Sequence, residues 1–81
     1  MPRFYFHIRN ADEMTLDDEG TDLPDLNAAR ELAMASAREL LANAIKEGRG
    51  RVPEGIVIAD AFGREVATVP IRDVVPSHLR I

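Results

Sequence analysis

Apolar and polar residues alternate strictly near the N-terminus. In RFYFHIR, Phe4, Phe6 and Ile8 occupy every second position, which is the period of a half-buried β-strand. NADE follows as a turn, and EMTLDD places Met14 and Leu16 on one face of a short second strand. These segments predict a first hairpin, with Met14 and Leu16 directed into the core.

From Asp25 the apolar spacing changes to three and four. The main stripe comprises Leu26, Ala29, Ala33, Ala37, Leu40 and Ala44, with Met34, Leu41 and Ile45 on adjacent rows. This spacing predicts an amphipathic helix of about five turns. Pro24 marks the boundary before it, Asp25 is the expected N-cap, and Gly48 is the expected left-handed residue at its end.

A second hairpin is predicted after a glycine-rich connection. GIVIAD is a compact apolar strand, DAFGR a turn, and EVATVPI a further strand. The Asp60 side chain can bond back to the main chain in such a turn, and Gly63 can adopt the positive φ that the turn requires.

The predicted order defines an α+β fold, a two-layer β-β-α-β-β sandwich. A four-stranded, mainly antiparallel sheet carries one long helix on one face. We expect residues 1–73 to form a single domain and residues 74–81 a partly ordered C-terminal tail that packs Val74, Val75 or Leu79 on the edge of the core. One helix covers only one face of a sheet, so the second face is a candidate contact surface.

Composition narrows the functional classes. The 81 residues are 46% apolar and 30% charged, and they include no cysteine, which excludes disulfides, thiolate metal sites and cysteine nucleophiles. The N-terminus has no signal-peptide pattern, and no apolar run approaches the roughly 20 residues that span a bilayer. We expect a cytoplasmic protein. Phosphate-binding glycine loops and nucleophile elbows are absent from the sequence, so we expect no enzyme and no cofactor.

The net charge of -4 is unevenly distributed. Residues 1–25 carry seven acidic and two basic residues, which gives -5, whereas residues 26–51 sum to +2. Lys46, Arg49 and Arg51 form only a small basic cluster, too short for an extended nucleic-acid footprint. Nucleic-acid binding through this loop, with Tyr5 available for base stacking, is therefore disfavoured and kept as an alternative.

The stretch DDEGTDLPDLNAAR, residues 17–30, is the most conspicuous candidate site. Its acidic residues could supply oxygen ligands to a cation; the candidates are Asp17, Asp18, Glu19 and Asp22. An EF-hand alignment places Thr15 at the first ligand position and Leu26 at the twelfth, so that pattern fails. A turn at Gly20 ahead of a helix N-terminus is the favoured interpretation, and cation or small-ligand binding is a second alternative.

The leading hypothesis is a protein-interaction module that pairs with itself or with another protein. A small sheet with an uncovered face often buries it in a symmetric dimer. Phe62 at the tip of the second hairpin is either an exposed anchor for a partner or folds back onto the tail. The expected contact residues are Tyr5, His7, Val57, Phe62 and Val66. His7 has no second ligand at a matching spacing, so it fits a surface or interface role better than a metal site.

Three segments together are similar to a known family. MPRFYFH, DDEGTDLPDLNAAR and the segment DAFGREVATVP at residues 60–70 resemble short alphaproteobacterial proteins, especially rhizobial ones, which form a domain of unknown function. The resemblance covers about residues 1–73 and implies a bacterial, cytoplasmic protein without assigning a reaction or ligand. Phe62 stands where the family pattern leads us to expect a polar turn residue, and the basic loop at Arg49 and Arg51 is particular to this chain.

Overall fold

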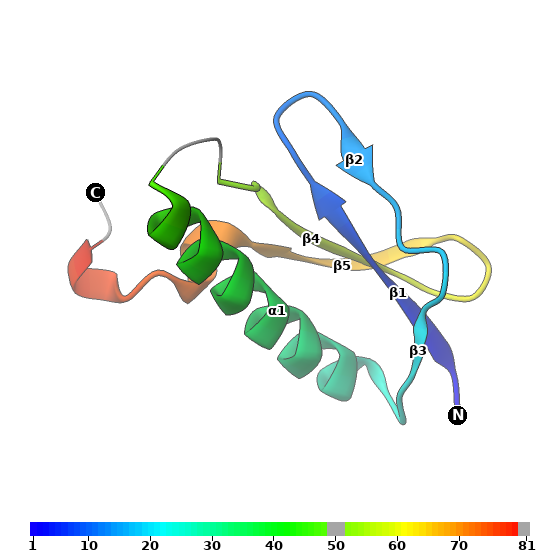
Figure 1. Cartoon of the computed structure of the whole chain (residues 1–81). Coiled ribbons are helices and arrows are strands. Elements are labelled where there is room, and N and C mark those ends of the chain that lie inside the picture. The colour runs from blue at the N-terminus through cyan, green and yellow to red at the C-terminus, as the bar shows by residue number, and fades with distance from the viewer. Residues whose placement is uncertain (49–51, 80–81) are drawn as a thin grey trace.

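The fold was analysed in a computed structural model, which describes residues 1–48 and 52–79 (Figure 1). Its elements in chain order are β1 (Arg3–Arg9), β2 (Met14–Thr15), β3 (Thr21–Asp22), α1 (Leu26–Glu47), β4 (Gly55–Ala59), β5 (Glu65–Pro70) and the short 3-10 helices η1 (Ile71–Val74) and η2 (Ser77–Leu79). The sheet order is β2-β1-β4-β5, all neighbours are antiparallel, and β3 pairs with β1. The predicted α+β architecture is confirmed; β3 is an additional short strand.

The helix begins and ends where its sequence predicts. Asp25 accepts a hydrogen bond from the backbone N–H of Ala28 at 2.9 Å, and Gly48 closes the last turn with a φ of 65°. Both arrangements satisfy backbone groups that a helix end otherwise leaves unpaired. Among the described residues, no helix is long and apolar enough to cross a membrane.

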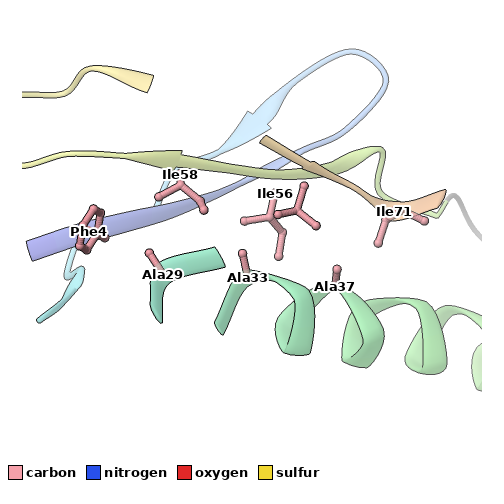
Figure 2. Packing of buried hydrophobic residues seen from close by; sticks show 8 residues of the cluster. Phe4, Ala29, Ala33, Ala37, Ile56, Ile58 and Ile71 are labelled. Atoms are coloured by element: carbon pink, nitrogen blue, oxygen red, sulfur yellow. The ribbon is translucent and has the colours of Figure 1, made fainter. Parts of the chain in front are cut away.

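Three alanines hold the helix against the sheet. Ala29, Ala33 and Ala37 have no exposed surface, and Figure 2 shows them directed at Ile56, Ile58 and Ile71. Their small side chains let the helix axis approach closely, so that α1 packs over β4, β5 and η1. The core is completed by Phe4 and Val69.

The last predicted strand ends one residue early, at Pro70, and Ile71 begins η1 instead. Ile71, the first residue of η1, is only 8% exposed and joins the core cluster. Val74 packs against that cluster, as expected, whereas the Leu79 side chain is exposed.

The predicted orientation of β2 is wrong by one residue. Ile8 pairs with Thr15 and Arg9 with Met14. Directly opposed residues of antiparallel strands share a face, and a one-residue shift exchanges the faces. Thr15 therefore lies on the helix side and Met14 on the opposite side, while Leu16 is 62% exposed.

The sheet face away from α1 is partly closed by its own side chains. Val57 and Ala59 lie on that face because they pair with His7 and Tyr5, yet both are almost completely buried. An ion pair of 3.9 Å joins Arg9 Nη2 on β1 to Glu65 Oε1 on β5. Since β4 separates these strands by two inter-strand spacings, the paired side chains must cross over β4.

The close helix–sheet contact makes a testable prediction. Ala33→Leu adds volume at a site with no free space, so we expect a loss of about 1–3 kcal/mol in the free energy of unfolding. Ala35→Leu, on the exposed side of the same helix, is the matched control and should change stability by about 0.5 kcal/mol or less. Urea denaturation measures both; equal losses would contradict close packing at Ala33.

Candidate functional site

The acidic segment is organised by one of its own carboxylates. Asp17 Oδ2 accepts the backbone N–H of Phe6 at 3.1 Å. Its Oδ1 accepts the N–H groups of Glu19 at 3.1 Å and Gly20 at 3.2 Å. Between β2 and β3, the Asp17 side chain therefore replaces a strand as the partner of the β1 edge.

His7 ties this loop to the open face of the sheet. The Asp17 N–H donates to His7 Nδ1 at 3.0 Å. A ring nitrogen that accepts a hydrogen bond carries no proton, so a neutral His7 holds its proton on Nε2. A hydrogen bond thus connects the acidic segment to His7, although the two are separate in the sequence.

Burial and hydrogen bonding act in opposite directions on Asp17. Burial raises the pKa of its carboxyl group, whereas the three backbone N–H groups and the nearby His7 lower it. The hydrogen bonds prevail and the pKa lies below its ordinary value. Asp17 therefore acts as an ionised structural anchor at neutral pH.

The other acidic candidates do not converge on a common point. Asp22 is held by Arg3, with Nε–Oδ1 at 2.8 Å and Nη2–Oδ2 at 3.2 Å, and this hydrogen-bonded ion pair lowers the pKa of Asp22. Asp18 and Glu19 are exposed. Within residues 1–48 and 52–79, no three His, Asp or Glu side chains group as metal ligands would.

Gly20 allows the loop to pack tightly on β1. Its φ is 74°, and a Cβ atom there would lie 2.8 Å from Arg3 Cγ and 2.9 Å from Tyr5 Cε2. Both the backbone conformation and the space thus favour glycine. This contact places the loop against the side chains of the open face.

The turn of the second hairpin has the Asp60 hydrogen bonds and the positive φ at Gly63 that its sequence predicts. Asp60 Oδ1 accepts the N–H groups of Phe62 at 2.9 Å and Arg64 at 3.0 Å, and Oδ2 accepts Arg64 Nε at 3.0 Å. The Gly63 N–H donates to the Asp60 carbonyl at 3.0 Å, with a Gly63 φ of 83°. The turn presents Phe62, which is 84% exposed, with the Arg64 guanidinium 5.4 Å from the ring centroid.

A shallow pocket of about 240 Å³ lies on the open face. Its lining residues come from β1 and the second hairpin: Tyr5, His7, Ala59, Asp60, Ala61 and Gly63. Tyr5 and His7, both half-buried, therefore stand beside the hairpin that carries Phe62. Val66 is 39% exposed, but Val57 is fully buried and offers no contact surface of its own.

A second pocket, of about 230 Å³, was not anticipated from the sequence. It lies between α1 and β1 and combines apolar and polar residues: Phe6, Ile8, Ser36, Glu39, Leu40, Asn43 and Ile56. It arises because α1 packs over β4 and β5. Helical periodicity identifies the buried stripe but not the strands that it covers, so no signal in the sequence locates this pocket.

The structure describes one residue of the predicted basic cluster. Lys46 is exposed in the last turn of α1. Arg49 and Arg51 lie outside the described residues.

A family described as domain of unknown function DUF6894 matches residues 3–72. No curated protein and no solved structure matches the chain.

The loop geometry predicts unequal effects at two glycines. Gly20→Ala forces a side chain into a positive φ and into contact with Arg3 and Tyr5, and we expect a loss of about 2–3 kcal/mol. Gly48→Ala meets the same restriction on φ with nothing within 4 Å, so about 1 kcal/mol should be lost. Chemical denaturation compares them; a smaller loss for Gly20→Ala would contradict the packing of the loop.

The Asp17 anchor predicts a dependence of stability on pH. Its pKa is lower in the folded than in the unfolded chain, so its stabilising contribution is complete above the unfolded pKa and disappears as pH falls through the folded pKa. Asp17→Asn should lower stability at neutral pH by about 1–2 kcal/mol. Its deficit relative to wild type should shrink between about pH 5 and pH 3.

Asp18→Asn is the matched control, because the exposed Asp18 carboxylate holds none of these three N–H groups. Its stability should follow wild type across the same pH range. A pH-independent deficit in Asp17→Asn would show that the charge of the anchor is unimportant.

Proposed function

Because the chain belongs to the DUF6894 family, a domain of unknown function, we propose a function from its own surfaces: the protein is a small non-enzymatic protein-interaction module that self-associates. The resemblance to short alphaproteobacterial proteins supports placing the module in the bacterial cytoplasm.

The observation that carries the proposal is the exposed Phe62 on a hydrogen-bonded turn. Burying a phenylalanine side chain is worth about 1.5–3 kcal/mol, yet this ring is 84% exposed. The Asp60 carboxylate fixes the turn through the N–H groups of Phe62 and Arg64. A preorganised aromatic side chain loses little conformational freedom on binding, and aromatic residues are enriched at interface hot spots.

The surface around Phe62 suits a protein partner. Val66 adds apolar area on β5, and Tyr5 and His7 contribute rings with polar atoms at the neighbouring pocket. Such a mixture of an apolar anchor and polar neighbours is typical of protein interfaces.

The titratable groups support a non-enzymatic role. The pKa of Asp60 is lowered by the Arg64 N–H, the Phe62 N–H and the Arg64 side chain, which outweigh its burial. Asp17 and Asp22 also have lowered pKa values. General acid–base catalysis by a carboxyl group is most efficient when its pKa is raised toward the working pH, so the lowered values and the hydrogen bonds favour a role as structural acceptors.

Self-association and the contribution of Phe62 can be measured together. In light scattering coupled to size exclusion at micromolar concentration, wild type should have twice the 9.0 kDa chain mass. Phe62→Ser should raise the dimer dissociation constant about tenfold or more, because a buried aromatic anchor is lost.

Leu16→Ser is the matched control, since it removes another exposed apolar side chain, which follows β2 at the edge of the sheet opposite β5. It should leave the dissociation constant unchanged. A wild-type mass of 9.0 kDa at every concentration would end the self-association proposal.

A further inference from the structure

The two outer edges of the sheet, on β1 and on β5, differ in how far their backbone groups are covered. On the outer edge of β1, Phe4 pairs with Thr21 and Ile8 with Thr15. The Phe6 N–H between them donates to the Asp17 carboxylate. This edge is therefore closed along its length.

The outer edge of β5 has no such cover. In the residues that the structure describes, β5 lies at the end of the strand order, and no strand pairs with its outer side. Among residues 1–48 and 52–79, no hydrogen bond of a loop or side chain reaches the backbone between Val66 and Val69. The segment Val66–Pro70 also has no charged residue of the kind that protects exposed edges.

The register shows which backbone groups face outward. The Ile71 N–H donates to the Glu54 carbonyl at 2.8 Å, and the Ile56–Val69 and Ile58–Ala67 pairs continue this register at steps of two residues. In an antiparallel ladder, alternate residues direct their N–H and C=O groups to opposite sides. Thr68 therefore directs its own N–H and C=O away from β4.

We propose that β5 pairs antiparallel with β5 of a second copy of this chain, about a two-fold axis at Thr68. This inference rests on the proposed self-association and gives its geometry. Ile58 pairs with Ala67 but Ala59 pairs with Glu65, so the register shifts at Val66 and the regular part of β5 is Ala67–Pro70. Because Pro70 has no backbone N–H, Thr68 is the residue of this part that directs both an N–H and a C=O outward. The two sheets become one continuous sheet.

A second copy fits this edge because both faces of the added strand match. On the helix side, β5 presents Ala67 and the buried Val69 beneath α1. An added strand must therefore be apolar on that side and tolerate solvent on the other. A two-fold axis perpendicular to the sheet supplies the same strand with its own helix on the same side.

The arrangement also gives Phe62 an apolar neighbour. Because the paired strands run in opposite directions, the hairpin tip of one copy extends beyond Pro70 of the other, toward its η1. There the half-buried Val74 can contact the exposed ring. The edge contact and the Phe62 contact then belong to one interface.

A charge placed at the axis tests the geometry. Thr68→Lys puts two ammonium groups directly opposite each other in the dimer, whereas lysine is well tolerated on an exposed edge of a monomer. We expect the dissociation constant to rise at least tenfold while circular dichroism remains that of the folded chain. Ala35→Lys adds the same charge on the exposed side of α1 and should dimerise as wild type does.

The outcomes separate the two proposals. A wild-type dimer that Thr68→Lys leaves intact overturns β5 pairing but preserves self-association, whereas a monomeric wild type overturns both. If Thr68→Lys fails to fold, amide exchange in the wild-type chain decides. Protection of the Thr68 N–H must then rise with protein concentration, and concentration-independent exchange overturns the pairing.

Discussion

The close approach of α1 to one half of the sheet is the constraint on which the rest of the structure depends. Ala29, Ala33 and Ala37 are fully buried, and their lack of bulk holds the helix over β4 and β5. One helix cannot cover the whole sheet, so the strands differ in how far the helix covers them. Phe6 and Ile8 on β1 line a pocket beside the helix instead of lying beneath it. Among the described residues no helix covers the opposite face, where an ion pair between Arg9 on β1 and Glu65 on β5 crosses over β4.

The acidic loop covers the outer edge of β1. A strand edge with free N–H and C=O groups is a template for unwanted pairing. Here one carboxylate, that of Asp17, receives the Phe6 N–H and closes its own loop through Glu19 and Gly20. The acidic segment therefore forms a hydrogen-bonded brace along this edge. The brace also orients the His7 ring, since the Asp17 N–H donates to Nδ1, and so the loop shapes the open face on which the pocket lies.

Local chemistry and the overall architecture were predictable from the sequence, whereas the long-range contacts of single residues were not. Asp25, Gly48, Asp60 and Gly63 act on residues within four positions, so their caps and turns were identified correctly. The role of Asp17 joins residues eleven positions apart. The sequence predicted the turn at Gly20, but not the carboxylate that holds it or the strand edge that it protects. Likewise, Val57 was expected on the uncovered face, and its complete burial depends on neighbouring strands. The orientation of Met14 and Leu16 was missed because a two-residue strand contains too little alternation to fix its register.

With the β1 edge closed, we propose β5 as the edge at which copies of the chain meet. The absence of cysteine from the sequence allows a direct test. Directly opposed residues of a hydrogen-bonded antiparallel pair have Cα atoms about 5.5 Å apart, within the range of about 4.4–6.8 Å that a disulfide spans. Under mild oxidation, Thr68→Cys should form a covalent dimer rapidly, whereas Ala35→Cys, on the exposed side of α1, should remain monomeric. Cross-linking of Thr68→Cys no faster than that of Ala35→Cys would contradict the account.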